Sequence, residues 1–387
     1  MRKLVVVLLV LALIATTVVG CATTTTAPAA APAAEAAPAA EPAAAEPATE
    51  AAPEEAATTP AKVALVVNQR LGDGGVVDDM ARGAEEAAAA FGVEVQILES
   101  ESQANHEDDL RAMAEAGYQL IITTFTPMSE ATKLVATEFP DTAFVAVYQF
   151  INSGDEKVAN VRSLEFRGNE AMFIEGYMAG LISPNKHVGF EIGGEEPGTS
   201  AEANGWLQGA ASASANMQLE YGVINSFEDP VKAKEIASAM ISKGVDVIHV
   251  PSCQSGNGII EACSENKSYA DSDVKSYYDV YNGMIGYCGM GFDASVYNSI
   301  QQFAEGTLEL GVHGYLDLTN GGYYMGWEDY EKFAADHPDM SASVLSAIEK
   351  GKAVEERIKS GDLKIVYDPE PSDPARSIAN AIAELQQ

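Results

Sequence analysis

Basic side chains are scarce in this sequence. Its 387 residues include 23 Lys and Arg against 57 Asp and Glu, which gives a formal net charge of −34 at pH 7. Such a polyanion repels phosphate backbones and anionic lipid headgroups. We therefore expect no binding to nucleic acid and no docking to a membrane through a basic surface.

Motifs of the common enzyme classes are missing as well. The chain has no G-x-S-x-G, H-E-x-x-H or Walker A motif, and no G-x-G-x-x-G follows a predicted strand. The histidines are scattered, and the two in predicted strands are interpreted as structural: His187 and His249. We expect a protein that is not an enzyme and that needs neither a cofactor nor a metal ion.

The N-terminus has the pattern of an export signal. Arg2 and Lys3 precede an apolar run over residues 4–14 and small residues over 15–20, so that 1–20 is predicted to be a signal peptide. The last five residues before and including Cys21 (TVVGC) resemble a bacterial lipobox, in which the Cys becomes the lipidated first residue. The alternative is an ordinary signal peptide beside a coincidental Cys.

Residues 21–61 hold the lipobox Cys followed by little except Ala, Pro, Thr and Glu. This composition cannot bury a core, and the recurring Pro interrupts any helix of the Ala-rich parts. We expect a disordered tether that holds a folded body away from the membrane carrying the lipid. Three further cysteines, Cys253, Cys263 and Cys288, either form one disulfide with one thiol left over or stay buried and reduced.

From Lys62 onward, apolar strands alternate with helices. The first half predicts strands at 63–67, 93–98, 120–124 and 143–147, with helices at 79–91, 105–116 and 129–138. The second half predicts helices at 170–181, 203–214, 231–242 and 258–263, with strands at 187–192, 219–224 and 245–250. Continuous apolar strands joined by helices are typical of parallel sheets covered on both faces.

Two such halves predict an α/β protein with two lobes, each a doubly wound and mostly parallel sheet. We expect an N-terminal lobe over 62–165, to which part of 280–315 returns, and a C-terminal lobe over 166–279. Residues 316–387 are expected to cross between the lobes. Ligands bind at the carboxyl ends of the strands in open α/β sheets, so two facing edges predict a clam-shell site.

Several segments carry a family resemblance, in the expected order over about 62–306. They are residues 160–180 (NVRSLEFRGNEAMFIEGYMAG), 187–194 (HVGFEIGG), 205–209 (GWLQG), 226–230 (SFEDP) and 244–248 (GVDVI). They resemble the basic membrane protein family of ABC-transporter substrate-binding lipoproteins, which includes purine-nucleoside receptors. The resemblance implies a periplasmic-binding-protein fold of type I and a site for a small solute.

The family's site residues carry over only in part. Residues 75–83 resemble the motif G-S-F-N-D-S-A-Y-x-G, where the Phe flanks a nucleobase and the Asn hydrogen-bonds it; Val77 and Asp78 stand at those positions. Tyr148 stands where the family's strand usually ends in Asp, and residues 288–291 (CGMG) replace its Ser-x-x-Lys. These changes remove the aromatic ring and the Lys that the family uses to hold a nucleoside in its usual pose.

What replaces these residues can still hold a solute. Rings that can stack on a base or sugar are Phe125, Tyr148 and Trp206, although Trp206 has the alternative of packing beneath the sheet. Polar candidates for the ligand are Asp73, Asp78, Asn204, Gln254, Ser255 and Asp273. The loop at 253–258 (CQSGNG) resembles the family's G-G-T-G-x-G loop.

These observations together predict an extracytoplasmic, lipid-anchored, monomeric solute-binding protein. It would capture a purine nucleoside by lobe closure and deliver it to the permease subunits of an ABC importer. Riboflavin or a sugar is the alternative solute. The alternative from another class is a membrane-anchored sensory lipoprotein without a transport partner.

Overall fold

The computed structural model describes residues 60–72, 74–275 and 279–386. The described residues all belong to one compact unit, Thr58–Gln387. The predicted signal peptide, the lipobox Cys21, the tether up to residue 59 and the candidate ligand residue Asp73 lie outside the described residues.

The first sheet has six strands within the described residues, in the order β11-β5-β4-β3-β1-β2, and all pairs are parallel. Its strands are β1 (Lys62–Val67), β2 (Glu94–Glu99), β3 (Leu120–Thr124), β4 (Ala143–Val147), β5 (Val161–Phe166) and β11 (Val312–Leu316).

The second sheet has the order β12-β10-β9-β8-β6-β7 in the described part of the chain. Its pairs are parallel except for β10 with β12, which run antiparallel. Its strands are β6 (His187–Ile192), β7 (Gln218–Val223), β8 (Val247–Val250), β9 (Tyr269–Ser272), β10 (Met284–Met290) and β12 (Tyr323–Met325). The expected α/β class with two mostly parallel sheets is confirmed.

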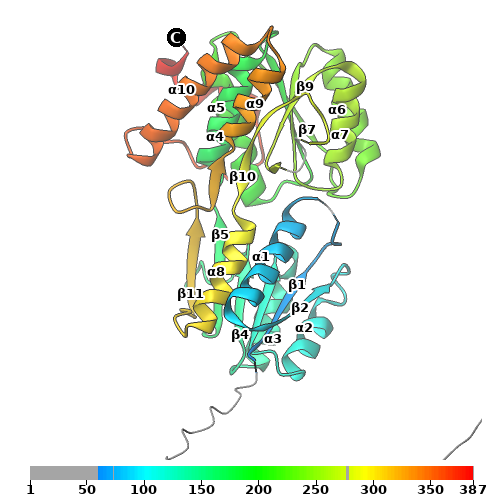
Figure 1. Cartoon of the computed structure of the whole chain (residues 1–387), viewed down its shortest axis with the longest axis vertical. Coiled ribbons are helices and arrows are strands. Elements are labelled where there is room, and N and C mark those ends of the chain that lie inside the picture. The colour runs from blue at the N-terminus through cyan, green and yellow to red at the C-terminus, as the bar shows by residue number, and fades with distance from the viewer. Residues whose placement is uncertain (1–59, 73, 276–278, 387) are drawn as a thin grey trace, which may run out of the picture. The chain divides into compact units, whose positions relative to one another are not determined.

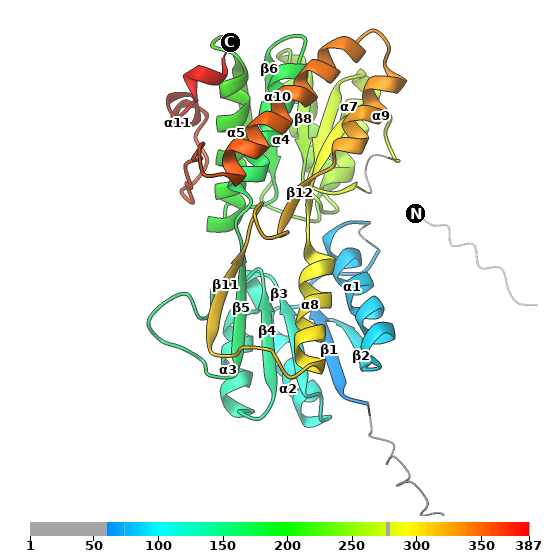
Figure 2. The ribbon, with the colours of Figure 1, turned by 60° about the vertical axis from the view of Figure 1, so that its left-hand side comes forward.

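Helices cover both faces of each sheet, as Figures 1 and 2 show. Those beside the first sheet are α1 (Val76–Phe91), α2 (His106–Glu115), η1 (Thr126–Met128), α3 (Ser129–Glu138) and α8 (Phe292–Ala304). Those beside the second sheet are α4 (Asn169–Ile182), α5 (Pro197–Ala213), α6 (Pro230–Ser242), α7 (Gly256–Asn266), α9 (Trp327–Asp336), α10 (Ser341–Lys359), α11 (Pro374–Ala379) and η3 (Ala383–Leu385).

Strand β1 shows how the apolar runs produce this layering. Val63 and Leu65 pack into the core that also contains residues of α1 and α8. Ala64 and Val66 point the other way, into a second core with residues of α2 and α3. Successive side chains of a strand face opposite sides, so a strand buried on both faces needs an apolar residue at every position.

The chain passes between the two sheets at three places within the described residues. It leaves the first sheet after β5, returns between β10 and α8, and leaves again between β11 and β12. We call the parts on either side of these crossings the first and the second lobe. In the C-terminal segment the chain crosses at residues 317–322, and β12, α9, α10 and α11 then pack on the second lobe. Tyr367 of the same segment contacts the first lobe, where its hydroxyl donates to Glu165 of β5 at 3.2 Å.

Helices α4 and α5 approach each other so closely that backbone meets backbone. A Cβ atom on Gly176 of α4 would lie 1.9 Å from the carbonyl oxygen of Trp206, and one on Gly209 of α5 would lie 1.9 Å from that of Phe173. Only glycine fits at these two crossing points. This contact fixes α5, which carries residues of the site described below.

We expect Gly176→Ala to destabilise the chain by roughly 1–3 kcal/mol or more, since the new methyl group must push two packed helices apart. The control is Gly154→Ala, because a Cβ there meets nothing within 4 Å. Urea denaturation of both variants measures the difference. Equal midpoints for the two variants would contradict the close packing of α4 on α5.

Candidate ligand-binding site

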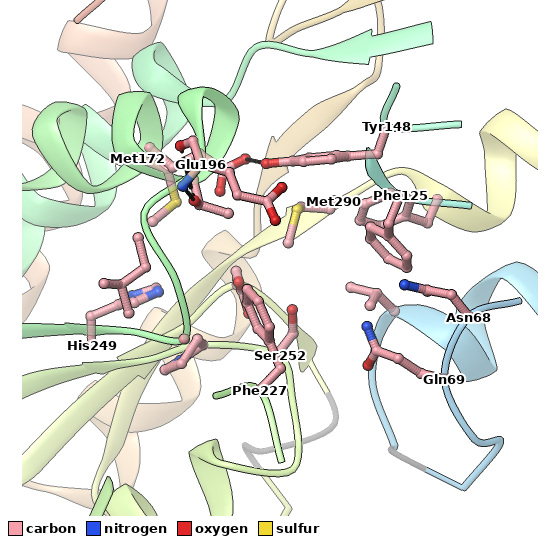
Figure 3. Close-up of a pocket in the computed structure, with 18 of the residues that line it drawn as sticks. Asn68, Gln69, Phe125, Tyr148, Met172, Glu196, Phe227, His249, Ser252 and Met290 are labelled. Atoms are coloured by element: carbon pink, nitrogen blue, oxygen red, sulfur yellow. Dashed lines mark hydrogen bonds between the residues drawn. The ribbon is translucent and has the colours of Figure 1, made fainter. Parts of the chain in front are cut away.

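A cavity of about 130 Å³ lies where the carboxyl ends of strands from both lobes meet (Figure 3). Residues of both lobes form its walls, from strand ends, from the loops just beyond them and from neighbouring helices. The lining residues are Asn68, Gln69, Val76, Phe125, Pro127, Tyr148, Met172, Phe190, Ile192, Gly193, Glu196, Thr199, Glu202, Phe227, His249, Pro251, Ser252, Asp273, Met290 and Phe292. The cavity thus lies at the carboxyl ends of the parallel strands, where open α/β sheets bind their ligands.

Two aromatic residues of the first lobe enter the cavity from unusual backbone positions. Phe125 follows β3 with φ +61°, and Tyr148 follows β4 with φ +58°. A positive φ at a residue with a bulky side chain costs about 1–3 kcal/mol, and such strain clusters at functional sites. The two ring centroids lie 5.8 Å apart, which gives this wall a continuous aromatic surface.

Carboxyl groups supply the negative charge of the cavity. Glu196, Glu202 and Asp273 line it, whereas no Lys or Arg is among its described lining residues. Asp273 is buried, and its Oδ1 has no hydrogen-bond partner in the part of the chain that the structure describes. Burial raises the pKa of Asp273 to about 6. The cavity is therefore equipped to accept hydrogen bonds from a neutral solute and to repel an anion.

Glu202 joins the lobes through hydrogen bonds. The hydroxyl of Tyr148, from the first lobe, donates to its Oε1 at 3.1 Å, and the hydroxyl of Tyr323, from β12, donates to the same atom. Burial raises the pKa of Glu202 to about 7, although both hydroxyls favour its charged form. The protonation of this carboxyl is therefore coupled to a contact between the lobes.

His249 lies in the wall of the second lobe, on β8, and its ring stacks on Phe190 at 4.3 Å. Its Nδ1 is 3.0 Å from Asp271 Oδ1 and 3.3 Å from Glu175 Oε2. The ligand atoms of these three residues lie within 4.8 Å of one another, so they are the group that could hold a metal ion among the described residues. All three side chains are buried.

Three of the residues predicted for the site line the cavity, namely Phe125, Tyr148 and Asp273. The motif at 75–83 contributes through Val76 and not through Val77, which packs into the core. Asp78 accepts hydrogen bonds from the backbone N–H groups of Gly72 and Gly74, at 2.7 and 2.8 Å. It therefore holds the loop before α1 in place and does not line the cavity.

The remaining predicted site residues lie outside the cavity wall. Asn204 donates to the carbonyl oxygens of Asp368 and Glu370, and so it fastens the C-terminal segment to α5. Trp206 is fully buried and donates through Nε1 to Asp271 Oδ2, as the alternative of packing beneath the sheet implied. Gln254 and Ser255 belong to the turn before α7, where the Ser255 hydroxyl bonds to the carbonyl oxygen of Ser226.

Other lining residues were not predicted, although a simple rule would have found several of them. Asn68 and Gln69 directly follow β1, Ser252 follows β8, and Phe292 follows β10. Phe227 lies in the loop after β7. Reading one or two residues beyond every strand would have selected Asn68, Gln69, Ser252 and Phe292 but not Phe227, because parallel strands end at the same edge.

The cysteines of the second lobe are reduced and form no disulfide with one another, which is the second of the two alternatives given above. Cys253, Cys263 and Cys288 are buried, and no disulfide joins them among the described residues. Burial raises the pKa of the Cys253 thiol to about 12, so these thiols are inert side chains of the core.

A comparison with protein families identifies the chain's relatives. The family model described as "ABC transporter substrate-binding protein PnrA-like" matches residues 61–362. The resemblance noted in the sequence is thereby confirmed. No helix of the described residues is long and apolar enough to cross a membrane.

Characterised relatives are similar over part of their length. The chain is 29% identical to "Basic membrane protein A" of Borreliella burgdorferi over 53% of this chain and 60% of that protein. It is 28% identical to "ABC transporter nucleoside-binding protein BmpA" of Lactococcus lactis, over 46% of this chain and 49% of that protein. The matched part thus spans about half to three fifths of these two relatives.

Solved structures share the fold. An ABC transporter solute-binding protein from Aeropyrum pernix superimposes with a TM-score of 0.69 at 23% identity, covering 83% of this chain and 96% of that chain. One from Conexibacter woesei gives a TM-score of 0.61 at 23% identity, covering 79% and 99%. The expected two-lobed binding-protein fold is confirmed.

The burial of Glu202 leads to a pH prediction. Its pKa is about 7 in the folded chain against an ordinary value of 4.5, so the folded state binds more protons between these values. The free energy of unfolding therefore falls as the pH rises from 4.5 to 7. We expect Glu202→Gln to remove on the order of 2–3 kcal/mol of this fall.

Urea denaturation across this pH window measures the effect in the parent chain and the variant. Glu86→Gln, which changes an exposed carboxyl of α1, is the control and should follow the parent curve. Parallel curves for Glu202→Gln and the parent would show that Glu202 is not buried as a titrating group.

Proposed function

We propose, from the premise that this chain belongs to the family of PnrA-like ABC transporter substrate-binding proteins, that it captures a small neutral solute and delivers it to an ABC permease. The observation that carries this proposal is the cavity between the strand ends of the two lobes. Such a position suits a receptor, because a solute that contacts both lobes stabilises the closed arrangement. The permease would then recognise the closed form.

The chemistry of the cavity favours a purine nucleoside. The cavity of about 130 Å³ is lined by aromatic rings and by carboxyl groups, which suits a solute with a flat ring and several hydroxyl groups. Phe125 and Tyr148 offer ring faces to a base, and Asp273 lines the cavity with an enclosed oxygen, Oδ1, that has no partner among the described residues and would accept from a ribose hydroxyl. The name of the Lactococcus lactis relative, a nucleoside-binding protein, supports the same class.

A phosphorylated solute does not suit this site. Three carboxyl groups, those of Glu196, Glu202 and Asp273, line the cavity against a single residue that can carry a positive charge among the described lining residues, His249. Uncompensated like charges in a buried site are expensive. A sugar or a flavin without phosphate would use the same rings and carboxyls, and it is the competing solute.

A thermal-shift panel of nucleosides, riboflavin, sugars and nucleotides tests the solute class, since a ligand that binds the folded state raises its melting temperature. We expect inosine, guanosine or adenosine to raise it and the matching monophosphates to leave it unchanged. A shift with riboflavin or a sugar but with no nucleoside would contradict the nucleoside proposal and retain the receptor.

Asp273→Asn then tests the unpaired oxygen. Losing a charged hydrogen-bond acceptor costs about 1.5–3 kcal/mol, so we expect the nucleoside Kd to rise roughly ten- to a hundredfold. Asp141→Asn removes the same charge from an exposed position just before β4, at the opposite end of that strand, and serves as the control. Equal affinities of the two variants in calorimetry would remove Asp273 from the site.

We further propose that the mature chain is a monomer on the outer face of a membrane, anchored by a lipid on Cys21. The lipobox-like residues 17–21 and the tether-like composition that follows support this anchor. Cys21→Ala should move the protein from the membrane fraction to the soluble fraction. Unchanged partitioning of the variant on fractionation would contradict the anchor.

A further inference from the structure

His249 is held in the cavity wall by one ring nitrogen. Both neighbouring carboxyl groups approach Nδ1, with Asp271 Oδ1 at 3.0 Å and Glu175 Oε2 at 3.3 Å. The stacked Phe190, with its ring plane within 4° of the imidazole, prevents the ring from tilting. The ring orientation is therefore fixed from two sides.

The other ring nitrogen remains for the cavity. Nε2 of His249 has no hydrogen-bond partner within residues 60–72, 74–275 and 279–386, and it is not one of the enclosed polar atoms without a partner. Figure 3 shows the ring extending from its strand toward the cavity. A solute in the cavity is thus the group that can satisfy Nε2.

The surroundings favour the charged imidazole. Burial opposes its charge, but the Glu175 and Asp271 carboxyls outweigh burial and raise the pKa of His249 to about 10. Asp271 also accepts a hydrogen bond from Trp206 Nε1, and Glu175 Oε1 accepts one from the backbone N–H of Cys288. Both carboxyls thus keep partners on the side away from the ring.

The titratable groups around the ring come from several elements. They are Glu175 of α4, Glu202 of α5, Asp271 of β9, Asp273 after β9, Cys288 of β10 and Tyr330 of α9. Burial, followed by the charge of Asp271, raises the pKa of Glu175. His249 is the one cationic group among the described lining residues.

We propose that His249 is the specificity-determining donor of this cavity: its charged Nε2–H binds a carbonyl oxygen or an unprotonated ring nitrogen of the solute. Asp271, which is hydrogen-bonded to Nδ1, is the positioning residue that holds a proton there, and Glu175 Oε2 lies 3.3 Å from the same nitrogen. The proposal rests on the proposed function, and it adds that the solute must carry an acceptor on the part that faces the second lobe. A solute that presents a cation there is rejected.

The charge on His249 is tested first, without any solute. We expect nitrogen NMR of the histidine-labelled full chain with Cys21→Ala to show both ring nitrogens of His249 protonated at neutral pH, and His249→Gln identifies the signals. A neutral ring there would overturn the proposal. One equivalent of Zn²⁺ that displaces the Nδ1 proton and raises the melting temperature of the protein would also overturn the proposal, because it would identify a metal site instead.

The contact to the solute is tested with inosine. We expect its saturation to shift the Nε2 resonance, and His249→Phe, which keeps a ring on Phe190, to weaken binding about ten- to a hundredfold. Because this variant leaves two buried carboxyls without their cation, His249→Gln is the second variant. It keeps a neutral donor and should retain more affinity than His249→Phe. His337→Gln, on a histidine outside the cavity, is the control.

The positioning role has its own measurement. Asp271→Asn should lower the pKa of His249 in the NMR titration. Inosine binding to this variant should then weaken as the pH rises through the lowered pKa. A purely structural role of Asp271 predicts no such pH dependence. Unchanged inosine affinity in His249→Phe would overturn the inference while the receptor stands. Absence of any shift in the solute panel would instead remove the proposed function, and the donor role with it.

Discussion

Parallel strand pairing is the constraint on which this structure depends. Parallel neighbours end at the same edge, and within the described residues every strand pair of both lobes except β10 with β12 is parallel. Each lobe therefore gathers its strand-ending residues at one edge, and the crossings place these two edges together. Phe125, Tyr148 and Asp273 come from three different strands, yet they meet at one cavity without any need for proximity in the chain.

The second constraint is the burial of acids in a chain that already carries an excess of negative charge. Glu175, Glu191, Glu202, Asp271 and Asp273 are all buried in the second lobe. Each buried carboxyl must take up a proton or find a partner. Glu191 takes the first course, because burial raises its pKa to about 9. Glu202 accepts hydrogen bonds from tyrosine hydroxyls, and Asp271 pairs with His249. These two acids therefore help to build the wall of the cavity.

The sequence predicted the first half of the fold closely and the last third poorly. Strands β3, β4 and β6 and helix α3 agree with the expected ranges residue for residue, because continuous apolar runs specify doubly covered strands. Helix α5 begins at Pro197, six residues before its predicted start at 203, since Glu196 and Thr199 form a capping box over a polar first turn. Strand β5 (VRSLEF) is half polar and lacks a continuous apolar run, and it was missed.

The site was less predictable than the fold, because its chemistry arises from contacts between distant segments. Tyr148 and Phe125 were found by their place after a strand, whereas Trp206 was chosen for its ring and is buried beneath the sheet. His249 was interpreted as structural, since an apolar strand gives no sign of a carboxyl partner. Asp271, 22 residues further along, reaches it only because β9 pairs with β8 in parallel register. A histidine acquires its charge from such a pairing, so the electrostatics of this cavity follow from sheet topology and could not be read from the neighbours of His249 in the sequence.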